Sequence, residues 1–227
     1  MTYQIYIGDR KYSSWSLRGW LMLEKFNLPY EATLIEMFSG TMADRMASLA
    51  PARLLPTLVL PDGTVVGETA AIAETLAERH PDAGLWPADA AARATARWLV
   101  AEMASGFAAL RQACPMQLAH IYDGFVPSDA VRADLARIET LFDHARAVSG
   151  SQDGWLFGAY SVADAFYAPV AARIVGYDLP VSERLRAYCR QTLSDPALLA
   201  WQARIDETSY GHDPYPMDLP HRPWQLG

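Results

Sequence analysis

Hydrophobic and polar positions change their spacing about every ten residues over the first eighty residues, which predicts several short elements there. Residues 3–7 form a short β-prone run that Gly8-Asp9 closes. Residues 14–26 follow as a mostly apolar helix, and we expect Arg18 on its more solvent-exposed face. The chain therefore begins with a strand followed by a helix.

This change of pattern continues to residue 80. Residues 30–36 alternate in the manner of a second strand, and residues 41–49 indicate a weak second helix. Residues 58–66 contain a Pro-Asp-Gly turn between two apolar runs, which predicts a β-hairpin. Residues 69–79 place apolar side chains on one face of an amphipathic helix. The order β-α-β-α-β-β-α predicts one parallel crossover and one antiparallel hairpin, hence a small mixed sheet covered by helices.

Beyond a linker rich in proline and glycine, the apolar spacing is helical throughout. Leu99, Met103, Leu110 and Cys114 fit one face of a single long helix. Further helices are expected at residues 131–145, 161–175, 181–193 and 196–208. Four prolines after Gly211 predict an extended or poorly ordered tail. The expected division is an α/β domain over residues 1–80, a linker over 81–88, an all-α domain over 89–210 and a tail over 211–227.

The composition narrows the class of protein. With 227 residues, 51% of them hydrophobic and 20% charged, the chain fits one large or two small globular domains and excludes a fibrous or largely disordered protein. Its 19 basic and 26 acidic residues give a net charge of −7 without a basic cluster, which argues against nucleic acid or an anionic membrane as a partner. The longest run without acidic or basic side chains, residues 112–122, is shorter than the ~20 residues that span a bilayer.

Cysteine usage and the first residues indicate where the protein works. Cys114 and Cys189 lie far apart, so neither a dithiol redox centre nor a multi-cysteine metal site is available, and a reducing compartment is expected. The chain reaches three charged residues at positions 9–11 without a long apolar run, so no signal peptide is expected. These features predict a cytoplasmic protein without a metal site.

Two serines precede the first predicted helix, where an α/β unit usually binds its ligand. Ser13 or Ser14 suits the N-cap position, and the free N–H groups of a helix start attract an anion such as a thiolate. Helix capping alone explains the same serines, and their spacing favours capping.

Two more segments lie at a strand entry and a helix start. In Leu55-Pro56-Thr57 a cis peptide bond is unsurprising, and it would present the backbone N–H and C=O of Leu55 to an extended ligand. Thr69 and the N–H groups at its helix start suit a carboxylate, while the Glu68 carboxylate suits an ammonium group. An α-amino-acid end group carries both charges. Taken singly, a proline that starts a strand and an ordinary N-cap explain the two segments equally simply.

The three segments in this order, within such a unit followed by an all-helical domain, resemble those of the glutathione transferase family over about residues 3–210. Leu54-Leu55-Pro56-Thr57-Leu58 is similar to the family's cis-proline segment, and Gly67-Glu68-Thr69-Ala70-Ala71-Ile72 to the segment that holds the γ-glutamyl end of glutathione. Ser161-Val162-Ala163-Asp164 matches the family's N-capping box, a folding element. The resemblance implies an α/β thioredoxin-like N-terminal domain plus an all-α C-terminal helical domain, with glutathione as co-substrate.

Within the family, Ser13-Ser14-Trp15-Ser16-Leu17-Arg18 is most similar to the pattern Ser-Ser-Cys-Ser-x-Arg, which implies a serine-type, zeta-like bacterial member. By that match Ser13 is the catalytic residue, which donates a hydrogen bond to the sulfur of glutathione and lowers the thiol pKa from about 8.5 toward neutrality. The residues implied to bind glutathione are Ser14, Leu55, Pro56, Glu68 and Thr69. Ser14 is an alternative partner of the sulfur, and Tyr6 and Tyr12 keep a tyrosine-type mechanism open.

Trp15 stands where the zeta-like pattern has cysteine, which counts against maleylacetoacetate isomerisation and against disulfide-forming chemistry. Packing of Trp15 against the second domain is the favoured interpretation. The resemblance implies a detoxifying homodimer that conjugates glutathione to small apolar electrophiles in a cleft between the domains. Candidates for the lining of that cleft, each also explained as core, are Trp98, Met103, Phe107, Leu110 and Tyr122. A non-catalytic glutathione-binding scaffold and a maleylacetoacetate-type cis-trans isomerase are the alternatives.

Overall fold

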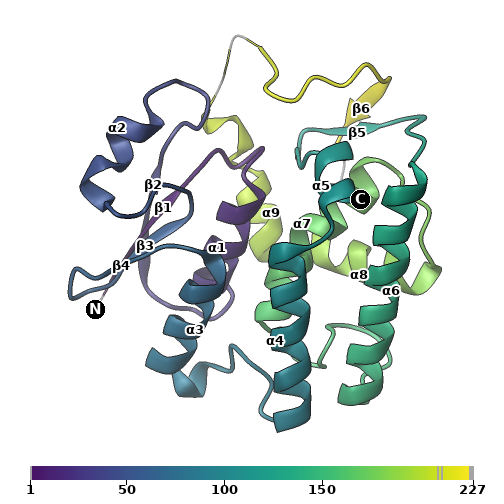
Figure 1. Cartoon of the computed structure of the whole chain (residues 1–227), viewed down its shortest axis with the longest axis horizontal. Helices are drawn as coiled ribbons and strands as arrows, with labels where there is room; N and C mark the ends of the chain where they lie inside the picture. The colour runs from purple at the N-terminus through teal and green to yellow at the C-terminus, as the bar shows by residue number, and fades with distance from the viewer. Residues whose placement is uncertain (1, 209, 211, 225–227) are drawn as a thin grey trace.

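A four-stranded mixed sheet organises the first part of the computed structural model in Figure 1, which describes residues 2–208, 210 and 212–224. Its strands are β1 (Tyr3–Ile7), β2 (Tyr30–Leu34), β3 (Thr57–Val59) and β4 (Val65–Val66). They lie in the order β2-β1-β3-β4, with β1 parallel to β2 and antiparallel to β3, and β3 antiparallel to β4. The predicted single crossover and hairpin are thus confirmed.

The helices of this part are α1 (Ser14–Glu24), α2 (Met42–Met46) and α3 (Thr69–Arg79), and a 3₁₀ turn over Ala47–Leu49 extends α2. α1 contacts β1 and α3 on one side and, on the other, α7 (Val162–Gly176) of the helical part. The prediction for Arg18 is therefore wrong, because a helix covered on two sides leaves this side chain 1% exposed.

The second part is helical and packs around one central helix. Its helices are α4 (Ala90–Ser105), α5 (Ala108–Ala113), α6 (Asp129–Ser149), α7 (Val162–Gly176), α8 (Glu183–Leu193) and α9 (Pro196–Gln202), with 3₁₀ turns at Pro81–Ala83 and Ile205–Glu207. α7 contacts α1, α4 and α8 and is buried along nearly its whole length. It begins at the predicted capping box, in which the Asp164 carboxylate accepts from the Ser161 N–H at 2.9 Å.

The expected single helix through Leu99 and Cys114 is wrong, because α4 and α5 are separate. The chain breaks at Gly106 and Phe107, and Phe107 has φ +56°, in the left-handed region. A Cβ on Gly106 would lie 2.8 Å from the Glu102 carbonyl oxygen, so the turn needs glycine. Leu110 and Cys114 stay buried after the break, so the apolar spacing alone did not reveal it.

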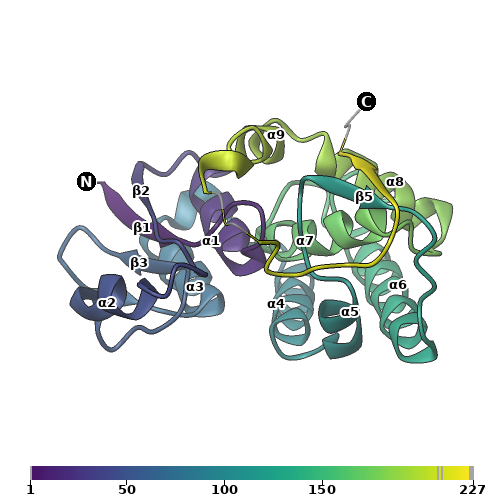
Figure 2. The same cartoon turned by 90° about the horizontal axis from the view of Figure 1, so that it is seen from above.

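The tail forms a strap between the two parts, as Figure 2 shows. Strand β6 (His221–Pro223) pairs antiparallel with β5 (His120–Tyr122), and the N–H of Trp224 donates to the Ala119 carbonyl at 2.8 Å. The prediction of an extended tail is confirmed for residues 212–224, whereas residues 211 and 225–227 lie outside the described part. Within that part, no helix has both the length and the apolar character needed to cross a membrane.

Candidate active site

A cavity of about 640 Å³ lies between the two parts of the chain and is called the interdomain cavity below. All six residues that the sequence singled out for a glutathione site line it, namely Ser13, Ser14, Leu55, Pro56, Glu68 and Thr69. The other lining residues are Tyr12, Trp15, Met37, Met42, Leu54, Ala108, Arg111, Gln112, Pro115, Met116, Arg173 and Tyr215. Segments that are up to fifty-six positions apart in the sequence (13 to 69) thus meet at one place.

Ser13 is the N-cap of α1 and is 5% exposed. Its Oγ accepts a hydrogen bond from the Ser16 N–H at 3.4 Å and donates one to the Ser16 Oγ at 2.8 Å. The Ser16 Oγ accepts in turn from the Gly8 N–H at 2.8 Å. Ser13 therefore does cap α1. To donate a hydrogen bond to a ligand in the cavity, its hydroxyl must turn its proton away from Ser16.

Ser14, the first residue of α1, has the less engaged hydroxyl. Its side chain makes no hydrogen bond to any other residue that the structure describes, while its carbonyl accepts from Nη1 of Arg18 at 3.2 Å. Both serines line the cavity. Ser14 consequently stays a second candidate for a hydroxyl that meets a ligand.

The Leu55–Pro56 peptide bond is cis. Neither the N–H nor the C=O of Leu55 hydrogen bonds within the described part of the chain, so both are available to an extended ligand. Pro56 packs closely on α1, because a Cβ on Gly19 would lie 2.6 Å from the Pro56 Cγ. Glycine at position 19 thus lets the proline loop and the helix approach each other.

The start of α3 faces the cavity without a side-chain cap. Glu68 occupies the N-cap position with φ +61° and ψ 123°, and its carboxylate makes no capping hydrogen bond. Thr69 is 4% exposed. Ordinary capping therefore does not explain Glu68, and the helix N–H groups keep the partial positive charge that favours a carboxylate.

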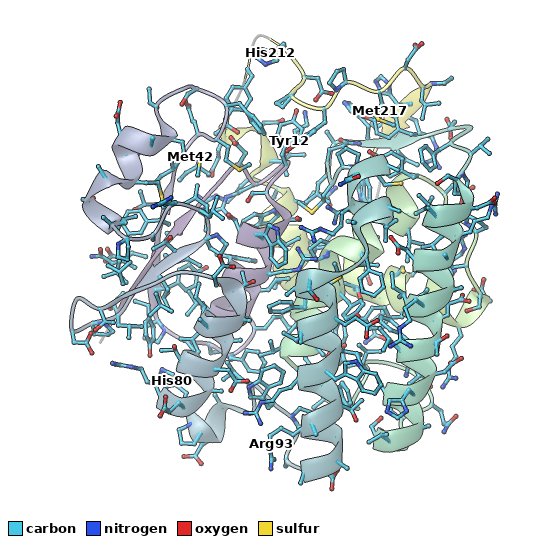
Figure 3. The ribbon with its side chains drawn as sticks, viewed as in Figure 1. Tyr12, Met42, His80, Arg93, His212 and Met217 are labelled. Carbon is cyan, nitrogen blue, oxygen red and sulfur yellow. The ribbon has the colours of Figure 1, made fainter. Side chains whose placement is uncertain are left out.

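Of the two tyrosines considered, Tyr12 lines the cavity and Tyr6 does not. Figure 3 shows Tyr12 between the two parts, beneath the tail. Burial, followed by the nearby Asp213 carboxylate, raises the Tyr12 pKa, so the phenol stays protonated at neutral pH. It can act there as a neutral hydrogen-bond donor and not as a phenolate base.

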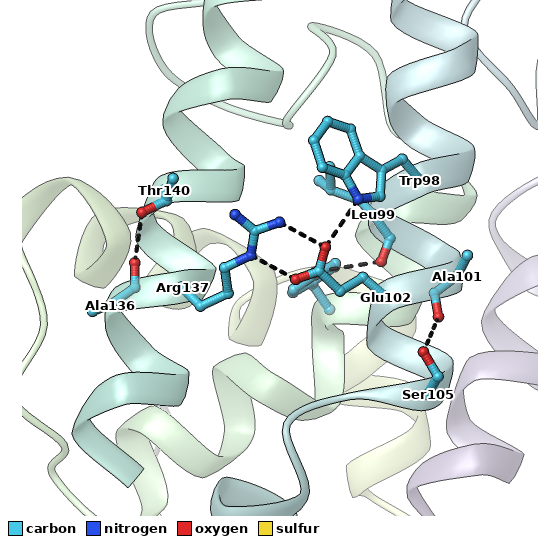
Figure 4. Close-up of polar contacts among 9 residues, drawn as sticks. Trp98, Leu99, Ala101, Glu102, Ser105, Ala136, Arg137 and Thr140 are labelled. Carbon is cyan, nitrogen blue, oxygen red and sulfur yellow. Dashed lines mark hydrogen bonds and ion pairs between the residues drawn. The ribbon is translucent and has the colours of Figure 1, made fainter. Parts of the chain in front are cut away.

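The interdomain cavity is not lined by any of the five candidates for the cleft, Trp98, Met103, Phe107, Leu110 and Tyr122, and the alternative explanation as core is confirmed for four of them. The last four are at most 6% exposed and belong to the core. Trp98 is 48% exposed on the outside of α4, where its Nε1 donates to Glu102, which pairs with Arg137 (Figure 4). The cavity wall is instead built mainly from Ala108, Arg111, Gln112 and Pro115. Their spacing is i, i+3, i+4 and i+7, which marks the side of residues 108–115 next to the one that carries Leu110, although Pro115 lies just beyond α5. This spacing was the available signal.

Trp15 packs against the helical part, as its favoured interpretation predicted. Its ring meets Phe166 edge-on at 6.4 Å between centroids, and the guanidinium carbons of Arg18 and Arg111 lie 4.4 and 5.1 Å from its centroid. The same ring also lines the cavity. Trp15 therefore links the packing of the two parts to the shape of the cavity.

The described part of the chain holds no group of three or more histidine, cysteine, aspartate or glutamate side chains arranged for a metal ion. Burial raises the Cys114 pKa to about 12, so this thiol stays protonated at neutral pH. The chemistry of the cavity is thus that of hydroxyls, backbone groups, one carboxylate and two guanidiniums.

Known proteins are similar to this chain over the part that contains the proposed glutathione-binding residues. Residues 12–79 match the family model of the glutathione S-transferase N-terminal domain. A probable maleylacetoacetate isomerase of Caenorhabditis elegans is 37% identical over 114 residues, which cover 50% of this chain and 52% of that protein. A maleylacetoacetate isomerase of Dictyostelium discoideum is 30% identical over 134 residues, 59% of each chain. The chain thus spans little more than half the length of the curated relatives it matches.

Solved structures share the fold over most of the chain. A glutathione transferase homolog from Burkholderia with bound glutathione has a TM-score of 0.67 at 23% identity and covers 92% of this chain and 100% of its own. Glutathione transferase Omega 2S from Trametes versicolor, in complex with 2,4-dihydroxybenzophenone, has a TM-score of 0.68 at 20% identity and covers 91% and 95%. The predicted fold class, a thioredoxin-like α/β domain followed by a helical domain, is confirmed.

Proposed function

Because residues 12–79 match the family model of the glutathione S-transferase N-terminal domain and a solved glutathione transferase homolog shares the fold over 92% of the chain, we propose that this protein is a glutathione transferase. It binds glutathione in the interdomain cavity and transfers the thiolate sulfur to a small, largely apolar electrophile. The observation that carries the proposal is the convergence of the two serines, the free backbone of Leu55 and the uncapped start of α3 on one cavity.

Glutathione binding rests on three complementary groups. Leu55 pairs its N–H and C=O with the cysteinyl backbone, as the edge of a sheet pairs with an added strand. Thr69 and the N–H groups that begin α3 hold the γ-glutamyl carboxylate, and the Glu68 carboxylate holds the neighbouring ammonium. Together they bind the carboxylate and ammonium of the γ-glutamyl end and the cysteinyl backbone, and they fix where the thiol lies.

Activation of the thiol rests on Ser13. Its hydroxyl turns from Ser16 to the sulfur and donates a hydrogen bond that stabilises the thiolate, while the thiol proton goes to solvent. The sulfur then donates an electron pair to the electrophilic carbon, and the bond to the leaving group breaks with its electron pair. With an aryl chloride the products are the thioether, chloride and a proton.

The test compares Ser13→Ala with Ser14→Ala on 1-chloro-2,4-dinitrobenzene at saturating glutathione. Loss of a hydrogen bond to an ionised group lowers kcat/KM by about tenfold to a hundredfold, and it shifts the pH of half-maximal rate upward. Thermal melting of both variants controls for the lost cap. Full activity of Ser13→Ala beside a loss in Ser14→Ala would assign the role to Ser14, and full activity in both would remove the serine mechanism.

A cis-trans isomerase is the second candidate, because the curated relatives are named as maleylacetoacetate isomerases. In that reaction the thiolate adds to a conjugated double bond, rotation follows, and the thiolate leaves again without net consumption of glutathione. Trp15 in place of cysteine counts against it. Isomerisation of a maleyl ketoacid at catalytic glutathione, followed by its absorbance, decides between the two reactions.

A non-catalytic glutathione-binding protein is the remaining alternative. Retention on glutathione-agarose without turnover of aryl halides, epoxides or a maleyl ketoacid would establish it. A cytoplasmic homodimer is part of the same proposal, and light scattering of the purified chain gives its mass against the 25.1 kDa of one copy.

A further inference from the structure

Three arginines gather beside the helical wall of the interdomain cavity, and each donates its hydrogen bonds to backbone carbonyls alone. Arg111 on α5 and Arg173 on α7 line the cavity, and Arg18 on α1 lies against Trp15. Arg173 donates to Cys114 and Pro169, Arg18 to Phe166 and Ser14, and Arg111 to Gly106. Among the described residues none of the three forms an ion pair. Their positive charges are therefore not neutralised within the described part of the chain.

Burial makes this lack of a carboxylate unusual. Arg18 is 1% exposed and Arg173 is 5% exposed, and Nη2 of Arg18 is buried without a hydrogen-bond partner. Burial and the charge of Arg111 lower the Arg173 pKa to about 10, which still leaves it charged at neutral pH. A buried charge without a counter-ion is strongly unfavourable, so the cluster favours an anionic ligand.

The ligand surface beside these arginines is apolar and aromatic. The rings of Trp15, Tyr12 and Tyr215 belong to residues that line the cavity, as do the side chains of Met116 and Pro115. Tyr215 comes from the tail and lies 5.8 Å from the Tyr12 ring. Aromatic rings around a space favour a flat guest, because offset and edge-on ring contacts are attractive.

The arginines also lie on the opposite domain from the groups proposed for glutathione. Leu55 and Thr69 belong to the thioredoxin-like domain, whereas Arg111 and Arg173 belong to helices of the second domain. The α-carboxylate of glutathione is already matched by the start of α3. The two guanidiniums are thus placed for a group on the second substrate.

Resting on the proposed transferase function, we infer that the second substrate is an aromatic carboxylate, whose carboxylate binds Arg111 and Arg173 while its ring lies among Trp15, Tyr12 and Tyr215. A guanidinium matches a carboxylate with two parallel donors, and Arg111, which donates only from Nη1 to Gly106, has such a pair to offer. Arg173 already donates from Nε and Nη1 to backbone carbonyls, so it contributes mainly charge. Arg18 lies behind Trp15 and Ser14 and adds positive charge on that side of the cavity.

The test uses two acceptors that differ only in this charge, 4-chloro-3,5-dinitrobenzoate and 4-chloro-3,5-dinitrobenzamide. In both, the glutathione sulfur bonds to the ring carbon, chloride leaves with its electron pair, and the thiol proton goes to solvent. We expect kcat/KM, corrected for the enzyme-free rate, to favour the acid. Arg111→Gln lowers the acid-to-amide ratio by about tenfold to a hundredfold, the loss usual for a hydrogen bond between charged groups.

Arg190→Gln is the matched control, because it removes one positive charge from an exposed position on α8. It should keep the wild-type ratio. An unchanged ratio in Arg111→Gln overturns the inference. A raised KM for glutathione with both acceptors alike also overturns it, because the arginines would then serve a carboxylate of glutathione.

A binding measurement keeps the inference testable without turnover. The unreactive pair 3,5-dinitrobenzoate and 3,5-dinitrobenzamide is titrated against tryptophan fluorescence, which the nitro groups quench near Trp15. Tighter binding of the acid in wild-type protein, weakened in Arg111→Gln, supports the inference, whereas equal binding of acid and amide overturns it. If neither chloro compound is conjugated but the acid still binds tightly, the transferase proposal fails and the carboxylate site stands.

Discussion

Replacement of Gly19 by alanine tests how closely α1 must approach the proline loop of the proposed glutathione site. The new Cβ would lie 2.6 Å from the Pro56 Cγ and 3.0 Å from its Cβ, closer than carbon atoms pack. Both atoms belong to the pyrrolidine ring, which is fixed to the backbone and has no rotamer that moves it away. The loop or the helix must therefore shift.

Two opposite effects decide the size of the change. Alanine in a helix is more favourable than glycine by about 1 kcal/mol. Overpacking of a tight contact costs about 1–3 kcal/mol. Since Gly19 is buried between α1 and the loop, we expect the clash to outweigh the gain, with a net loss of up to about 2 kcal/mol and a Tm lower by up to about 8 °C.

The shift should appear more clearly in glutathione binding than in stability. A displaced Pro56 moves the backbone of Leu55, so the KM for glutathione rises while the KM for the electrophile changes less. Urea unfolding and steady-state kinetics measure the two effects. Gly67→Ala is the control, because its Cβ would meet nothing within 4 Å although it precedes the same site. A more stable Gly19→Ala protein with an unchanged KM for glutathione would refute the reasoning.

Three further predictions concern buried polar groups. Burial raises the Asp164 pKa to about 6 although the carboxylate accepts four hydrogen bonds, so the contribution of this group to stability is fully present below about pH 4 and is lost as the pH rises through 6. Between these pH values the wild-type protein should lose on the order of 3 kcal/mol more than Asp164→Asn; parallel pH profiles in urea unfolding would contradict this. Tyr210→Phe removes the 2.6 Å hydrogen bond to the buried Asp9 carboxylate and should cost about 1.5–3 kcal/mol in urea unfolding, whereas a loss below about 0.5 kcal/mol would show that Asp9 finds another donor. Trp201→Phe removes the Nε1 donor to the Arg10 carbonyl at 2.7 Å and should cost about 1–3 kcal/mol, and an unchanged midpoint would show that the carbonyl regains a partner.

Most of the first domain could be predicted because its elements are local. The helix at residues 69–79 has the predicted bounds, and the order of the strands follows from one crossover and one hairpin. Arg18 shows the limit of this approach. The sequence pattern predicts that a lone arginine among apolar residues is exposed to solvent. In the structure α7, about 150 positions later in the chain, covers it. Burial of that kind is tertiary and has no local signal.

The two sides of the interdomain cavity also differed in how well the sequence predicted them. Ser13, Leu55 and Thr69 were predicted to bind one ligand because each marks the end or start of an element in one small domain. The opposite wall was missed because it depends on the break at Gly106, which turns α5 so that Arg111 faces the cavity. Arg173 was equally hidden, since a helix that is buried on every side has no polar face to mark.

Residues 13–19 connect the two sides of the cavity through one turn and a half of helix. Ser13 and Ser14 lie where the sulfur is proposed, Gly19 admits the loop that carries Leu55, and Trp15 and Arg18 meet the helical domain beside Arg111. A change at Trp15 should therefore alter both substrate sites at once, because its ring lines the cavity and also packs on the helical domain. The net charge of −7 hides a cavity of the opposite sign, because the wall facing Ser13 carries guanidiniums without carboxylates in the described part of the chain. If these charges hold the second substrate, raising the salt concentration should weaken binding of the acid only modestly, since buried pairs are screened far less than those on the surface.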